Sequence, residues 1–144
     1  MINLDALYQE VLLDHYRKPR NKGPLAGATA DAEGRNPLCG DEVNVAVRMD
    51  GDTVAEVRFT GQGCSISQAA ASVMTQLVAG KSVAEVETLF ARFHGLVTGS
   101  APLTDGEGKA LGAMAAFAGV SKYPMRVKCA TMSWHTLRKA MGRE

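Results

Sequence analysis

Three cysteines are the side chains of this chain best suited to chemistry, and each stands where the residue pattern changes from one predicted element to the next. Cys39 lies in a predicted loop, whereas Cys64 and Cys129 lie at predicted helix starts. Asp41 follows Cys39 by two positions, and Gly40 between them allows the backbone to turn so that both side chains reach one point. Three thiolates and one carboxylate can complete a tetrahedral shell around Zn²⁺. We therefore predict one metal site with the ligands Cys39, Asp41, Cys64 and Cys129.

The predicted ligand set favours a reactive site over a purely structural one. A carboxylate is a harder ligand than a fourth thiolate, so the shell should exchange a ligand more readily than a four-cysteine shell. At Cys64 and Cys129 the positive end of the following helix favours the thiolate form. A thiolate released from the shell can attack a persulfide or disulfide sulfur. Four anionic ligands around Zn²⁺ leave two excess negative charges, which Arg126 and Lys128, both just before Cys129 in the sequence, could offset.

The spacing of the cysteines alone leaves a second interpretation open. Free cysteine is among the most buried residue types, and the chain contains no CxxC pair, so inert core positions are the alternative.

The histidines are weaker candidates for functional residues than the cysteines. We expect His15, on the polar side of the first helix, and His94 to be structural or solvent-facing. His135 lies about 240° around a helix from Cys129 and is not expected in the same shell.

Length and composition narrow the class of protein. A chain of 144 residues fits one domain, residues 1–144. Sixteen basic against fifteen acidic residues, without a dense basic run, argue against nucleic-acid binding. No stretch approaches the ~18 apolar residues of a membrane span, and the N-terminus lacks a basic, apolar signal, so we expect no membrane partner and a cytoplasmic location. The odd number of distant cysteines fits reduced thiols or metal ligands.

Periodicity predicts a small sheet between helices. The predicted elements are an N-terminal helix ending before Pro19, an edge strand within 28–33, a hairpin of strands 43–49 and 55–59, and helices 64–79, 83–93, 109–118 and from about 130. Ser82 and Glu85 form a capping-box pattern, and Asp50-Gly51-Asp52 supplies the hairpin turn. This order predicts an α+β fold, a small antiparallel three-stranded sheet with helices packed on one face.

The segments that carry the cysteines resemble a known family. They resemble the three cysteine motifs of IscU/NifU-like iron-sulfur cluster assembly proteins, and within them the SufU branch: Asn36-Pro37-Leu38-Cys39-Gly40-Asp41, Gly61-Gln62-Gly63-Cys64-Ser65-Ile66-Ser67 and Arg126-Val127-Lys128-Cys129-Ala130. The resemblance runs from Tyr8 to Leu137. IscU-type scaffolds carry a histidine where this chain has Lys128, and their segment between the second and third cysteines is shorter. Both differences are typical of the SufU branch.

The resemblance implies an IscU/SufU-like fold and a zinc-dependent sulfurtransferase. One Zn²⁺ per chain would be ligated by Cys39, Asp41, Cys64 and Cys129. Cys39 would accept sulfur from the persulfide of a pyridoxal-phosphate cysteine desulfurase of the SufS type, and Arg126 would serve in docking and activating that partner. The sulfur would then be relayed to other iron-sulfur assembly proteins. Two alternatives stay open: a scaffold that binds iron or a transient iron-sulfur cluster, and a purely structural zinc interaction domain.

Overall fold

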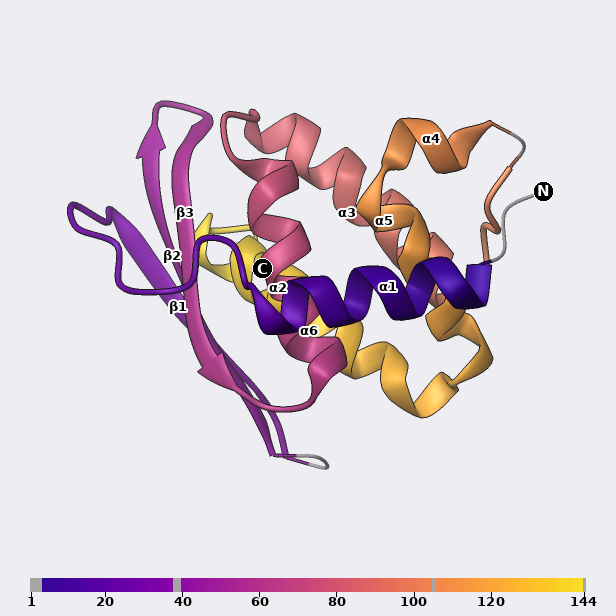
Figure 1. Cartoon of the computed structure of the whole chain (residues 1–144). Coiled ribbons are helices and arrows are strands. Elements are labelled where there is room, and N and C mark those ends of the chain that lie inside the picture. Colours follow the sequence, from indigo (N-terminus) through magenta and orange to yellow (C-terminus); the bar gives the residue numbers. More distant parts are fainter. Residues whose placement is uncertain (1–3, 38–39, 105, 144) are drawn as a thin grey trace.

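The computed structural model describes residues 4–37, 40–104 and 106–143 (Figure 1). Short 3₁₀ helices are labelled η. The elements in chain order are α1 (Leu4–Arg17), β1 (Ala30–Asn36), β2 (Asp41–Asp50), β3 (Thr53–Gln62), α2 (Ser65–Val78), α3 (Val83–Thr98), α4 (Glu107–Leu111), α5 (Ala113–Ala116), η1 (Phe117–Lys122), η2 (Pro124–Arg126) and α6 (Val127–Ala140).

The sheet has three antiparallel strands in the order β1-β2-β3. Alternation dictates its two faces, because successive side chains of a strand point to opposite sides. Along β2, Val43, Val45 and Val47 are buried, whereas the intervening positions are more exposed. The β2–β3 turn falls at Gly51, whose φ of 60° suits glycine. The predicted hairpin and three-stranded sheet are therefore confirmed.

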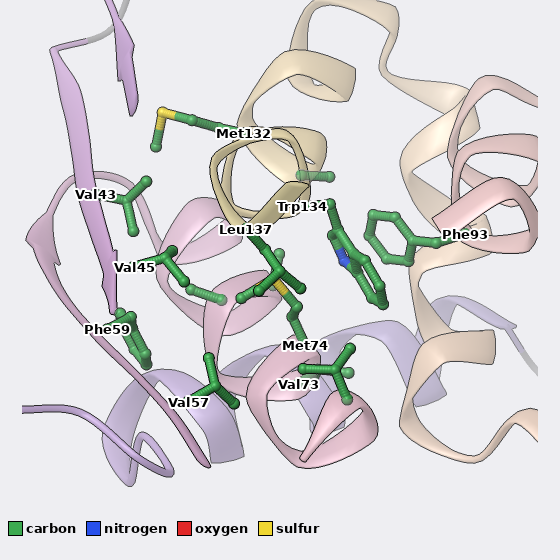
Figure 2. Close-up of a cluster of buried hydrophobic side chains, with 14 of the residues drawn as sticks. Val43, Val45, Val57, Phe59, Val73, Met74, Phe93, Met132, Trp134 and Leu137 are labelled. Carbon is green, nitrogen blue, oxygen red and sulfur yellow. The ribbon is translucent and has the colours of Figure 1, made fainter. Parts of the chain in front are cut away.

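Helices α2 and α6 cover one face of the sheet and form the core with it (Figures 1 and 2). In Figure 2 the strand side chains meet those of both helices, and Phe93 of α3 closes the far side. The labelled core residues are Val43, Val45, Val57, Phe59, Val73, Met74, Phe93, Met132, Trp134 and Leu137. The predicted α+β architecture, with helices on one sheet face, is confirmed.

The remaining helices pack outside this layer. Helix α1 lies across α2, and α3 packs against η1 and α6 (Figure 1). The ring of Phe93 lies 5.2 Å from that of Trp134 and 5.6 Å from that of Phe117, measured between centroids. Throughout the described ranges, every helix is too short or too polar to cross a membrane.

His15 is buried, so its expected place on the polar side of the first helix was wrong. Its Nδ1 lies 2.8 Å from the Ser72 hydroxyl of α2, which also accepts the backbone N–H of Arg20 at 2.8 Å. Positions 8, 11, 12 and 15 lie on one helical face, so His15 continues the stripe that packs on α2. Burial lowers the pKa of His15, and the nearby Arg20 lowers it further.

Several element boundaries differ from the predicted ones. Strand β1 occupies 30–36 rather than 28–33, and α3 continues to Thr98 before ending at Gly99, whose φ is 79°. The expected helix 109–118 is divided into α4 and α5 at Gly112, whose φ of 58° and ψ of −132° are not helical. Helix α6 begins at Val127, three residues early, because η2 after Pro124 leads directly into it.

Candidate metal centre

Asp41 is a fully buried carboxylate at the start of β2. It lies opposite Asn36, the last residue of β1. Its Oδ1 accepts the backbone N–H of Cys64 at 2.8 Å, and its Oδ2 lies 3.5 Å from the Cys64 sulfur. A buried carboxylate is unfavourable unless it is hydrogen-bonded or paired with positive charge, so its placement beside a thiol needs explanation.

Gly63 allows the carboxylate to reach this position. Its φ is +154°, and a Cβ at this residue would lie 2.8 Å from Asp41 Cγ and closer still to Oδ1. The segment between β3 and α2 thus packs directly on the acid, and only a residue without a side chain fits there. Because Gly63 has no side chain, the segment 61–64 can bring Cys64 next to Asp41.

Cys64 is the N-cap of α2 and is partly buried. Its side chain makes no capping hydrogen bond, and its carbonyl accepts the Ser67 hydroxyl at 3.0 Å. The thiol is therefore not used to stabilise the helix. As predicted, the cysteine stands at a helix start.

Cys129 is the third residue of α6 and is 1% exposed. The side-chain amide of Asn36 lies 3.9 Å from its sulfur. Strand β1 and helix α6 thus meet at this thiol. Because α6 begins earlier than predicted, Cys129 lies within its first turn rather than before it.

Three chain-distant side chains converge at this point. The ligand atoms of Asp41, Cys64 and Cys129 all lie within 4.8 Å of one another. Atoms that share a tetrahedral zinc ion are about 3.5–3.8 Å apart for metal bonds of about 2.0–2.3 Å, so only a small contraction is needed. Two sulfurs and one carboxylate oxygen fit the donor preference of zinc. The fourth predicted ligand, Cys39, lies outside the described residues.

Tyr8 of α1 borders the site and was not among the predicted site residues. Its pKa is raised to about 12, mainly by burial and then by the neighbouring Tyr123 and the thiol of Cys64, while Arg126 acts in the opposite direction. Arg126 and Lys128 are both exposed. Arg126 and Tyr8 line the same pocket.

Asn36 is the second residue that was missed. It opens the segment that leads to the first cysteine and could have been noticed as a short amide beside a predicted thiol ligand. No pattern marked Tyr8, because it belongs to the apolar repeat of α1. His94 and His135 do not join the ligand group. Both contact Phe90, at 5.8 and 5.1 Å between ring centroids.

This fold and its cysteine-containing site place the chain in a family. Residues 7–130 match the family described as the NifU-like N terminal domain. The chain belongs to this family.

Several individual members of this family are similar to the chain over nearly its whole length. The chain is 42% identical over 142 residues to the zinc-dependent sulfurtransferase SufU of Bacillus subtilis, which covers 99% of this chain and 94% of the relative. It is 39% identical over 140 residues to the iron-sulfur cluster assembly scaffold protein IscU of Streptococcus pyogenes, covering 97% and 86%. A crystal structure from Fervidobacterium islandicum, named as a scaffold protein for the SUF system, superposes with a TM-score of 0.79 at 35% identity, covering 94% and 97%. The expected membership of the IscU/NifU-like family is confirmed.

Proposed function

We propose that the chain is a zinc-dependent sulfurtransferase that accepts persulfide sulfur and relays it to iron-sulfur cluster assembly. The observation that carries the proposal is the convergence of Asp41, Cys64 and Cys129 within 4.8 Å. The full-length similarity to a protein named a zinc-dependent sulfurtransferase supports the same choice.

Asp41, Cys64 and Cys129, together with Cys39, would hold one Zn²⁺. Bound zinc would keep the cysteine sulfurs as thiolates, because a coordinating thiol is deprotonated. The protein orients the carboxylate through the Cys64 N–H and through the close approach of Gly63. Asn36 supplies an N–H group toward the Cys129 sulfur, which favours its anionic form.

Cys39 would perform the transfer. Its thiolate attacks the outer sulfur of a persulfide on the donor, a new sulfur–sulfur bond forms on Cys39, and the donor's sulfur–sulfur bond breaks. The donor cysteine leaves as a thiolate, so electrons balance without an added oxidant or reductant. The product is a persulfide on Cys39, ready for a second exchange with an acceptor.

The donor in this proposal is a pyridoxal-phosphate cysteine desulfurase of the SufS type, and the acceptors are other iron-sulfur assembly proteins. Arg126 would contact the desulfurase. It lies on the surface beside a pocket of about 570 Å³, and Met125 next to it is 90% exposed. A cation within an exposed apolar rim is suited to partner contact, since arginine is enriched in protein interfaces.

The test is alanine production by the desulfurase, measured with the purified zinc-loaded chain. Cys39→Ala should abolish the acceleration that the chain gives, and Arg126→Ala should weaken it while zinc content stays at one per chain. Arg143→Ala, which removes an exposed cation near the C-terminus, is the matched control and should behave like the unmodified protein. Unchanged acceleration by the Cys39 variant would refute the proposal.

A scaffold that carries a transient iron-sulfur cluster is the second candidate. The observation in its favour is the 39% identity to a protein named as such a scaffold. Against it stands Lys128, because a lysine is not a usual iron ligand. Elemental analysis and anaerobic reconstitution separate the two candidates. About one zinc per chain without a visible chromophore supports the sulfurtransferase, and a stable absorbing cluster supports the scaffold.

The third candidate is a purely structural zinc domain. A zinc-loaded chain that neither binds nor stimulates a desulfurase would indicate this function.

A further inference from the structure

An open groove of about 690 Å³ runs between β1 and α6. One wall is the strand segment 33–37, and the other is a single face of α6. The helix residues that line it recur at helical spacing: Lys128, Thr131, Met132, His135, Thr136 and Lys139. The groove therefore has a strand edge on one side and a helix on the other.

The two edges of the sheet differ in their backbone partners. The outer edge of β3 is covered in its middle, where Phe59 donates to the carbonyl of Asn21 at 3.0 Å and Gly23 donates to the carbonyl of Phe59 at 2.9 Å. Within the parts of the chain that are described, residues 30–35 of β1 make backbone hydrogen bonds to β2 alone. An unpaired strand edge beside a helix is the geometry in which an extended peptide adds as a further strand.

The two walls of the groove have similar lengths. The eleven-residue separation of Lys128 and Lys139 along α6 corresponds to about 16 Å at 1.5 Å per residue. The strand wall has five residues, and the four steps from its first to its last residue span about 13 Å at 3.3 Å per residue. An extended segment of about five residues fills this length.

The charge of the groove selects an acidic occupant. Lys128, Lys139 and Arg35 line it, against one carboxylate, that of Glu33. Arg35 lies 3.8 Å from Glu42 in an exposed pair, whereas neither lysine has an ion pair or side-chain hydrogen bond among the described residues. Two unpaired cations at the two ends of a groove attract carboxylates spaced along a strand.

The floor of the groove favours a peptide over a nucleic acid. Gly34 and Met132 lie there, and Gly34 approaches Thr136 so closely that no side chain would fit between them. The lining contains no Phe, Tyr or Trp on which a base could stack, and the one aromatic ring there, the imidazole of His135, already contacts Phe90 at 5.1 Å between centroids.

We propose that this groove binds an extended acidic segment of a partner protein, about five residues long, as a fourth strand of the sheet beside β1. The Lys128 end of the groove adjoins Cys129, and Asn36 contacts both the groove and that sulfur. A partner bound there is held next to the metal centre by contacts that involve no sulfur chemistry. The proposal therefore goes beyond the proposed function and does not depend on it.

The test is fluorescence anisotropy of a labelled heptapeptide in which glutamate alternates with valine or threonine, titrated with the full chain. We expect saturable binding that weakens about tenfold between 50 and 500 mM salt. Lys139→Glu should weaken it at least fivefold. Lys81→Glu, the same charge reversal at an exposed lysine outside the groove, is the matched control and should change it less than twofold.

Two altered peptides test the mode of binding. The same heptapeptide with N-methyl groups on alternate amides should lose at least tenfold in affinity, because the added strand loses its backbone donors, and ¹⁵N amide shifts should move most at residues 30–36. The proposal is overturned if the acidic peptide does not bind, if a lysine-substituted peptide binds as well, or if N-methylation has no effect. Tighter binding of an oligothymidine would instead assign the groove to nucleic acid. The groove would instead be assigned to a second copy of the chain if the chain self-associates, if Lys139→Glu abolishes that self-association, and if the acidic peptide does not bind.

Discussion

Replacing Gly63 with alanine should disable the metal site while leaving the rest of the fold in place. A Cβ there would lie 2.8 Å from Asp41 Cγ and 3.0 Å from its Cα. Ordinary carbon contacts begin near 3.5 Å, so the acid must retreat by about 0.5 Å or more. The backbone at Gly63, with φ of +154°, would also be strained by about 1–3 kcal/mol in any other residue.

The displaced carboxylate should lose its bond to the Cys64 N–H, now 2.8 Å long. Hydrogen bonds to charged groups contribute about 1.5–3 kcal/mol, so together with the backbone strain the loss of unfolding free energy should be about 2.5–6 kcal/mol. Disturbing the groups that orient a metal ligand typically costs about 10- to 100-fold in metal affinity, and we expect that loss of zinc affinity here.

Competition with a chromophoric chelator measures zinc affinity, and urea unfolding of the same samples measures stability. Gly80→Ala is the matched control, because Gly80 also has a positive φ, of +81°, but has nothing within 4 Å of its added Cβ. It should reproduce part of the stability loss and none of the loss in zinc affinity. The reasoning fails if Gly63→Ala binds zinc within twofold of the unmodified chain, or if both variants lose zinc equally.

Three further changes test other parts of the fold. Leu137→Ala should lower the unfolding free energy by about 2–5 kcal/mol, because Leu137 is fully buried between α6 and the sheet; a loss below 1 kcal/mol in urea would contradict this packing. Ser82→Ala removes the hydroxyl that accepts the Glu85 N–H at 3.1 Å and should cost about 1 kcal/mol in a thermal melt, whereas an unchanged melting temperature would show that the cap is dispensable. Arg92 and the backbone of Thr104 lower the pKa of Glu107 from 4.5 to about 2, so its stabilising contribution is complete above about pH 4.5 and is lost as pH falls toward 2. The difference in urea midpoint between the unmodified chain and Glu107→Gln should therefore shrink over this range, and a constant difference would disprove the link.

Local patterns allowed much of the fold to be predicted. Strict alternation identified β2 and β3, and the Ser82–Glu85 pair identified the start of α3, because both signals lie within a few residues of the structure they specify. The positions at which a helix is interrupted were harder to predict. Gly112 interrupts an alanine-rich segment that reads as one helix, and its conformation depends on how α4 and α5 pack.

The same distinction between local and long-range signals applies to the candidate metal centre. Asp41, Cys64 and Cys129 were predicted because few side chains can bind a metal, and each lies at an element boundary. The surroundings could not be predicted, since they depend on contacts across the fold. Asn36 reaches the Cys129 sulfur only because β1 packs on α6. Tyr8 borders the site only because α1 lies across α2, a contact that no local pattern reveals.

The single tryptophan gives the protein a built-in optical probe. Trp134 is fully buried on α6, five residues after Cys129, and stacks on Phe93. Its indole N–H has no hydrogen-bond partner among the described residues, so in the native state its emission should be blue and free of solvent relaxation. Any event at the first turn of α6 that loosens this helix will expose the ring to water and shift its emission toward red wavelengths. If zinc binds as proposed and its release loosens the first turn of α6, the emission wavelength of Trp134 should report that release in real time without a label.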